Sequence, residues 1–183
     1  GGSGIIGMWN AFRQLLAMGF VRGELPRFVS VQERGCDPIV RAVRGAEPQR
    51  AGPNDCGPAA PSPADFGAPG RVSSQPTGLR VPEPPDGGLV ARIVRETGGT
   101  AVAVSAEAIR RGQRELGRCG ISASPEGGAA WAGMIELLDS GWIRPTDNVV
   151  LFNTAHAMKY WPHPMPGLPV VAAYDDWVRL QPD

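Results

Sequence analysis

The chain has 183 residues, of which 42% are hydrophobic and 20% are charged. That is room for one ordinary domain with a real core, so wholesale disorder is not expected. Lys and Arg number 18, as do Asp and Glu, and this balance gives no electrostatic reason to expect nucleic acid or an anionic membrane as a partner.

Three further features bear on location and metal binding. No apolar run reaches the roughly 18 residues of a membrane span, and the first residues lack the basic start of a signal peptide. We therefore expect a cytoplasmic protein with no membrane partner. The scattered cysteines Cys36, Cys56 and Cys119 match neither a disulfide framework nor a zinc site, and two histidines without a ligand pattern predict no metal.

Helices and strands alternate in the predicted order. Apolar residues at helical spacing from Ile5 to Leu16 predict a helix ending near Gly19, followed by a strand over 27–32 and a helix over 38–43. Later segments predict a helix over 88–96, a strand from Thr100, a helix capped by Ser105 and running to about 117, and a helix over 127–138. NVVLFN, from Asn148, predicts another strand. The pattern indicates an α/β fold with an open, largely parallel sheet flanked by helices.

Three short motifs are candidates for chemistry. GGSGIIG directly precedes a helix, so its unhindered amides suit a phosphate, although a flexible terminus has the same composition. Thr154 follows the predicted strand 148–153, where open α/β sheets place ligand groups, and an ordinary strand end is the alternative. Glu126, in SASPEGGAAWAG, begins a helix, for which capping is a sufficient explanation.

Several stretches in order resemble one family, the threonine synthase-like group of fold type II pyridoxal phosphate enzymes. They are GGSGIIGMWNAFRQLLAMGF, LPRFVSVQERGCDPIVRAV, TGLRVPEP, RETGGTAVAVSAEAI, SASPEGGAAWAG and VVLFNTAHAMKY. The resemblance implies a cofactor, pyridoxal 5'-phosphate, and an amino-acid substrate. It also implies a lyase of amino-acid metabolism that converts O-phosphohomoserine and water into threonine and phosphate, and a homodimer in the full-length protein.

The resemblance also implies the roles of individual residues. The phosphate of the cofactor would be held by the amides of Gly1, Gly2, Ser3, Gly4 and Ile5. Thr154 would hydrogen-bond the pyridine nitrogen, and a neutral hydroxyl there makes the ring a milder electron sink. Glu126 would lie near the ring. Ala155 stands where the family has glycine, which alters the shape of this pocket.

The family's Schiff-base lysine has no counterpart in this chain. Lys159 is the only lysine, and the family places its reactive lysine upstream of the phosphate loop, so no catalytic residue is assigned. The sequence therefore predicts a C-terminal fragment that is inactive alone. Two alternatives remain open: an ammonia-lyase of the same fold acting on serine, threonine or diaminopropionate, and a non-catalytic truncated module that binds a phosphate-bearing ligand or a partner subunit.

The resemblance divides the chain into four parts. Residues 1–44 carry the phosphate loop, its helix and the next strand and helix of the cofactor-binding domain. Residues 45–77 are rich in Gly and Pro and predict an insertion, a linker or the product of a frameshift. Residues 78–165 form the remainder of the cofactor-binding domain, and 166–183 form a C-terminal tail.

Overall fold

Two parallel strands form the centre of the computed structural model, which describes residues 2–45 and 78–160. Gly1, Cys56, most of the Gly- and Pro-rich stretch (46–77) and residues 161–183, including the predicted tail, lie outside the described residues. Strands β1 (Val29–Glu33) and β2 (Thr100–Val104) pair in register from Val29 opposite Thr100 to Glu33 opposite Val104. This pairing joins the segments before and after the stretch 46–77 into one sheet.

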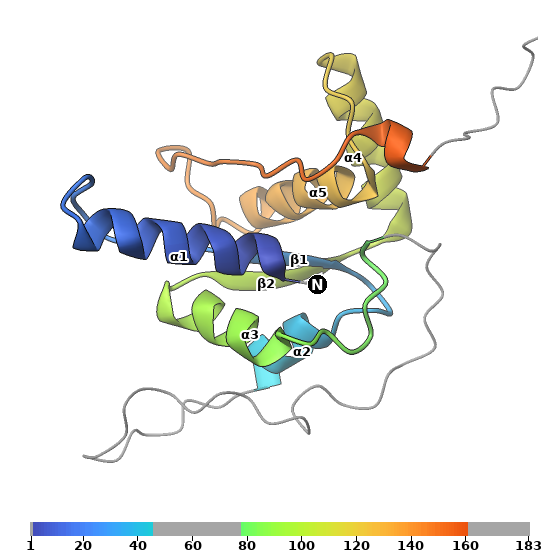
Figure 1. The fold of residues 1–183 in the computed structure, drawn as a ribbon. Helices are drawn as coiled ribbons and strands as arrows, with labels where there is room; N and C mark the ends of the chain where they lie inside the picture. Colours follow the sequence, from blue (N-terminus) through green and yellow to red (C-terminus); the bar gives the residue numbers. More distant parts are fainter. Residues whose placement is uncertain (1, 46–77, 161–183) are drawn as a thin grey trace, which may run out of the picture.

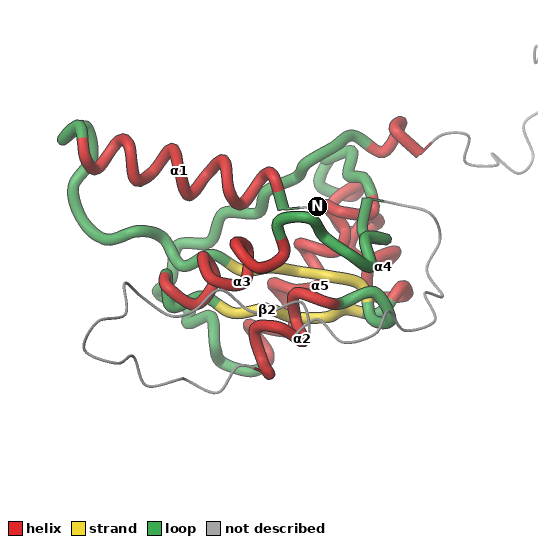
Figure 2. Tube along the Cα trace, turned by 60° about the horizontal axis from the view of Figure 1, so that its bottom comes forward, coloured by secondary structure: helices red, strands yellow, loops and turns green. Residues whose placement is uncertain are grey.

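Helices cover both faces of this sheet, as Figures 1 and 2 show. Helices α2 and α3 lie on one face and α5 on the other, while α1 packs against α3 and α4 packs against α5. The bounds are α1 (Ser3–Ala17), α2 (Pro38–Gly45), α3 (Gly87–Glu96), α4 (Ala106–Arg118), α5 (Pro125–Asp139) and the short 3-10 helix η2 (Ala157–Tyr160). The expected α/β class, a parallel sheet flanked by helices, is confirmed.

The buried side chains explain why these elements hold together. Val104 of β2 packs with Ile109 of α4 and with α5. Trp9 of α1 packs with Phe28, which precedes β1, and with Ile93 of α3. Because both faces of the sheet are covered, β2 (TAVAV) is apolar with little alternation, which is typical of parallel sheets, whereas β1 (VSVQE) also carries polar residues. The helix cap predicted at Ser105 is confirmed, since its hydroxyl accepts a hydrogen bond from the Ala108 amide at 3.1 Å.

The strand predicted over NVVLFN is wrong. Residues 148–153 have no regular secondary structure, and the sheet of the described residues consists of β1 and β2 alone. Val150 is 91% exposed. The preference of Val and Phe for strands reflects packing against neighbouring strands, and no neighbouring strand lies beside this segment in the part of the chain described.

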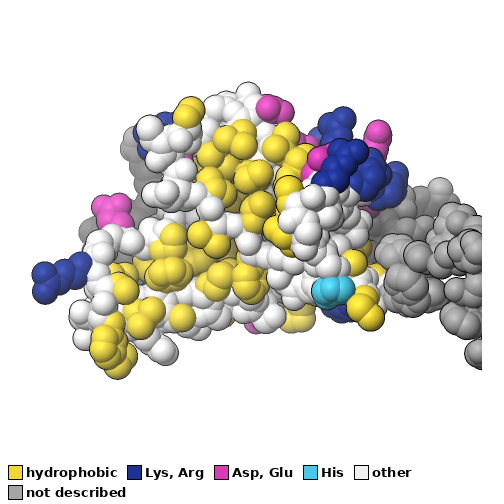
Figure 3. Space-filling model, turned by 90° about the horizontal axis from the view of Figure 1, so that it is seen from above, with side chains coloured by type: hydrophobic (Ala, Val, Ile, Leu, Met, Phe, Trp, Pro, Cys, Tyr) yellow, Lys and Arg dark blue, Asp and Glu magenta, His cyan; other side chains and the backbone are white. Residues whose placement is uncertain are grey.

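One face of the molecule carries many apolar side chains. Figure 3 shows them spread over much of this face. The exposed large apolar residues of the described chain include Phe12 and Met18 of α1, Phe20 after it, and Val150 and Phe152 of the irregular segment. Among residues 2–45 and 78–160, no helix is both long and apolar enough to cross a membrane.

Candidate functional site

The amino-terminal end of α1 presents backbone donors that no side chain caps. Gly2 is the N-cap residue, and no side-chain hydrogen bond is made there. The first backbone bond runs from the Ile6 amide to the Gly2 carbonyl at 3.1 Å, so the amides of Ser3, Gly4 and Ile5 precede the helical hydrogen-bond pattern. Uncapped amides and the positive end of the helix dipole favour an anion such as a phosphate.

The geometry differs in one respect from the loop predicted over residues 1–5. Ser3, Gly4 and Ile5 form the first turn of α1, and Gly1 lies outside the described residues. The donors are therefore those of a helix end rather than of an extended loop, because the helix begins as soon as Gly2 has turned the chain.

Gly2 fixes how this helix end sits on α3. Its φ of 110° lies in the region that favours glycine. A Cβ added at this position would lie 2.6 Å from Cγ2 of Val90, which is buried in α3. Only glycine fits both the turn and the close approach, so the direction of the first-turn amides depends on it.

The irregular segment that follows 148 passes beside this helix end. A Cβ added at Gly4 would lie 3.3 Å from the Phe152 ring. The next residue, Asn153, lies against Gly127 of α5 and donates from Nδ2 to the Ser122 carbonyl at 3.3 Å. The segment 152–153 thus lies between the amino-terminal ends of α1 and α5.

Thr154 follows directly in this segment. Its side chain is exposed and forms no hydrogen bond with the described residues. Its backbone is held on both sides, because Asn153 is bonded to Ser122 and the Ala155 carbonyl accepts from the Ser124 amide at 3.0 Å. The hydroxyl is therefore presented from a fixed backbone close to the start of α5.

Glu126 lies at the start of α5 in a small polar cluster. The Tyr160 hydroxyl donates to Glu126 Oε1, and the Gly78 amide lies 2.9 Å from both Glu126 Oε1 and the Tyr160 oxygen. Three distant parts of the chain meet here. Two further atoms, Glu126 Oε2 and Ser124 Oγ, are inaccessible to solvent and form no hydrogen bond of good geometry among the described residues.

This cluster keeps Glu126 ionised. Burial of the carboxyl opposes ionisation, but the hydroxyls of Ser124 and Tyr160 and the Glu126 amide outweigh it and lower the pKa of Glu126 below its ordinary value of 4.5. Conversely, burial and the neighbouring Glu126 carboxylate raise the pKa of Tyr160 above 10.0. The phenol is therefore the donor and the carboxylate the acceptor.

Substituting Glu126 tests this arrangement by the pH dependence of stability. Since the folded pKa is lowered, the carboxylate stabilises the fold above about pH 4.5, and this contribution is lost as the pH falls through the folded pKa. Glu126→Gln is expected to reduce the difference in the free energy of unfolding between about pH 7 and about pH 3, measured by urea denaturation. Glu24→Gln, at an exposed position, is the control, and equal changes in both variants would contradict the assignment.

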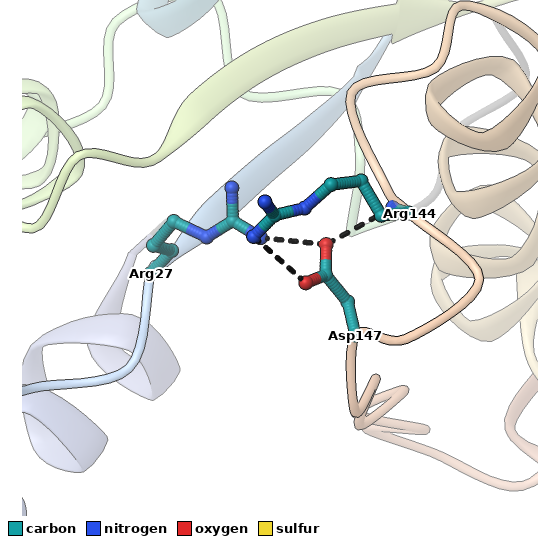
Figure 4. Close-up of polar contacts among 3 residues, drawn as sticks. All are labelled: Arg27, Arg144 and Asp147. Atoms are coloured by element: carbon teal, nitrogen blue, oxygen red, sulfur yellow. Dashed lines mark hydrogen bonds and ion pairs between the residues drawn. The ribbon is translucent and has the colours of Figure 1, made fainter.

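An ion pair anchors the beginning of the irregular segment (Figure 4). Asp147 accepts from Arg27 Nη2 at 2.9 Å, from the Arg144 amide at 3.0 Å and from Arg144 Nη2 at 3.3 Å. The Arg144 amide, with the guanidinium groups of Arg144 and Arg27, lowers the pKa of Asp147 below 3.8. Arg27 also stacks on Trp142, with Cζ 4.3 Å from the ring centroid. These contacts connect the chain before β1 to the segment that leads to Thr154.

The predicted site residues are thus partly brought together. The start of α1 and the segment before Thr154 meet at Gly4 and Phe152, and Glu126 lies one residue before Gly127, which contacts Asn153. Lys159 is exposed on η2, with Nζ 5.4 Å from the Tyr160 ring centroid. The sequence analysis missed Phe152 as a site neighbour and Tyr160 as the partner of Glu126; only the motif TGLRVPEP pointed to the region of Gly78.

Residues 1–155 match the family of pyridoxal-phosphate dependent enzymes. The chain belongs to this family, whose members depend on pyridoxal phosphate. Among curated proteins, it is similar to the threonine synthase of Methanosarcina acetivorans, with 30% identity over 156 residues, which are 85% of this chain and 34% of that protein. It is also similar to the threonine synthase of Methanocaldococcus jannaschii, with 29% identity over 156 residues and the same shares. The chain spans about a third of the length of these relatives.

The described residues fit the family's cofactor at two places. The uncapped amides of Ser3 and Gly4 suit a phosphate ester, because only glycine at position 2 leaves them oriented together. Near the start of α5, the exposed Thr154 hydroxyl, which forms no hydrogen bond with the described residues, suits the polar edge of a ring. Phe152 lies against Gly4 and two residues before Thr154, and it provides an apolar surface there.

Proposed function

We propose that this chain forms the cofactor-binding part of a pyridoxal phosphate-dependent lyase that acts on O-phosphohomoserine, as threonine synthase does. The observation that carries the proposal is the contact between Gly4 and Phe152, which brings a phosphate-binding helix end beside the segment of Thr154. The similarity over 85% of the chain to two proteins named threonine synthase supports the choice of reaction.

Each part of the site has a distinct role in this proposal. When bound, pyridoxal phosphate supplies an electron sink for bonds broken at the α-carbon of an amino acid. The amides of Ser3, Gly4 and Ile5 bind the phosphate and fix the position of the ring. Thr154 offers a neutral hydroxyl to the ring nitrogen, and Phe152 excludes water beside the phosphate.

Glu126 completes the site as a fixed negative charge. Its carboxylate stays ionised at neutral pH because Tyr160 and Gly78 donate to it. Because Oε2 is inaccessible to solvent and Oε1 is bonded, Glu126 acts through its charge and by holding Tyr160 and Gly78 beside the start of α5, not by contact with the substrate. This role requires the hydroxyl of Tyr160 to remain protonated, which its raised pKa ensures.

Cofactor binding by the 183-residue chain tests the proposal. Pyridoxal phosphate is expected to bind at least about tenfold more tightly than pyridoxal, since only the phosphate ester engages the amides of α1. Equilibrium dialysis of both compounds measures this ratio. Equal affinities, or no binding of either compound, would contradict the phosphate site.

The same preparation tests the reaction. We propose that it releases no phosphate from O-phosphohomoserine, because Lys159 is the only lysine and it projects from η2 rather than from the start of α1. It should nevertheless bind O-phosphohomoserine more tightly than threonine when loaded with the cofactor. Tighter binding of threonine would favour an ammonia-lyase instead.

A further inference from the structure

A shallow, open cavity lies beside α4. Its volume is about 600 Å³, and α4, the turn at 120–123 and the start of η2 line it. None of residues 2–5 belongs to its walls. A cavity of this size accommodates a small organic molecule, because ligand pockets range from about 300 to 1,000 Å³.

Two arginines of α4 supply its charge. Arg110 and Arg114 both line the cavity, and a spacing of four residues places them on one face of the helix. Neither forms an ion pair with a described residue, whereas Arg118 on the same helix pairs with Glu115 at 2.7 Å. Among residues 2–45 and 78–160, no Asp or Glu lines the cavity. Two uncompensated guanidinium groups, in a chain whose net charge is zero, favour an oxyanion.

The basic side chains are visible as a group in Figure 3. Lys and Arg gather at one corner of this face, with Asp and Glu side chains among them. Guanidinium groups bind phosphate through two parallel hydrogen bonds, and adjacent arginines can engage several oxygens of one phosphate. The charge pattern therefore selects a phosphate group over a neutral ligand.

Part of the cavity lining is apolar. Ile121, which is 44% exposed, lines it together with Ala123 and Ala157. An exposed isoleucine beside a cavity gains free energy when an apolar group covers it. A ligand that uses both the arginines and this apolar part carries a phosphate at one end and an apolar body at the other.

Hydrogen bonds connect residues of this lining. Ser122, also in the lining, accepts from the Ala157 amide at 3.3 Å and lies 3.2 Å from Nδ1 of His156. His156 Nδ1 also accepts from the Met158 amide at 3.1 Å. These hydrogen bonds join the turn at 120–123 to η2.

We propose that this cavity binds a small organic phosphate monoester through Arg110 and Arg114, separately from the phosphate site at the start of α1. The ester group lies between the two guanidinium groups, and the organic body covers Ile121. The proposal does not depend on the function proposed above, since the two sites share no lining residue.

Binding of phenyl phosphate to the 183-residue chain, followed by calorimetry, tests the proposal. Arg110→Gln combined with Arg114→Gln is expected to weaken binding at least about tenfold. Arg111→Gln is the matched control, because this arginine lies on the same helix but outside the cavity lining, and it should change the affinity less than about twofold. Ile121→Ser should weaken phenyl phosphate binding more than inorganic phosphate binding. Circular dichroism verifies that each variant is folded.

The outcomes separate this site from its alternatives. Equal losses of phenyl phosphate affinity in the Arg111 variant and in the double variant would show general charge attraction and overturn the proposal. Inorganic phosphate binding as tightly as phenyl phosphate would overturn the assignment of an ester with an apolar body. Pyridoxal phosphate is itself a phosphate monoester and can enter both sites, so the double variant should keep the pyridoxal phosphate binding that depends on Gly2. Loss of all pyridoxal phosphate binding in the double variant would show that both ligands use one site and would overturn the proposal.

Discussion

Replacing Gly112 with alanine is expected to lower the free energy of unfolding by about 2–3 kcal/mol. An added Cβ would collide with the carbonyl group of Gly128, whose Cα would lie 3.1 Å away. The approach is mutual, since a Cβ at Gly128 would lie 2.5 Å from the Ile109 carbonyl oxygen. Backbone lies on both sides of this contact, so no side-chain rotation relieves it and α4 must move away from α5.

Gly117→Ala is the matched control for this prediction. Gly117 lies on the same helix, but a Cβ there would meet no atom within 4 Å. Alanine in an exposed helical position stabilises relative to glycine by about 0.5–1 kcal/mol. Urea denaturation should therefore show opposite signs for the two variants, and destabilisation by both would refute the role given to the helix contact.

Gly2→Ala is expected to reduce the affinity for pyridoxal phosphate at least about tenfold. Alanine is strained at a φ of 110°, and its Cβ would lie 2.6 Å from Val90 Cγ2. Relief of the backbone strain and of the close contact with Val90 requires the first turn of α1 to rotate away from α3. This rotation changes the direction of the amides proposed to bind the phosphate. Equilibrium dialysis measures the affinity.

Gly7→Ala is the control for replacing a glycine of α1 with alanine. Gly7 lies in the second turn of α1, is exposed, and would place a Cβ within 4 Å of no atom. The affinity of this variant for pyridoxal phosphate should stay within about twofold of that of the unsubstituted chain, and its free energy of unfolding should rise slightly. If Gly2→Ala bound pyridoxal phosphate as well as Gly7→Ala does, the phosphate site would lie elsewhere.

Most of the fold was predictable because its signals are local. Apolar residues at helical spacing identified α1 and α5, the cap at Ser105 identified the start of α4, and β-branched runs identified β1 and β2. The strand prediction for segment 148–153 was wrong for the opposite reason. Its composition is that of a strand, but a strand depends on a neighbour, and sequence composition does not identify that neighbour.

The candidate site was less accessible to sequence reasoning. The resemblance selected Gly2, Thr154 and Glu126, whose proposed roles remain predictions. The contact between Gly4 and Phe152 and the hydrogen bond from Tyr160 to Glu126 join residues that are far apart in the chain. Such contacts depend on how the helices pack, and no sequence pattern identifies Phe152 or Tyr160 as a neighbour of the site.

The pairing of β1 with β2 also has a consequence for biosynthesis. The ribosome releases Val29 long before Thr100, its partner in the sheet. Until then, β1 lacks β2, its partner in the described structure, and contacts between distant positions form slowly once both segments are available. A nascent chain at this stage is a natural client for chaperones, and fast translation or high expression temperature should divert it into inclusion bodies.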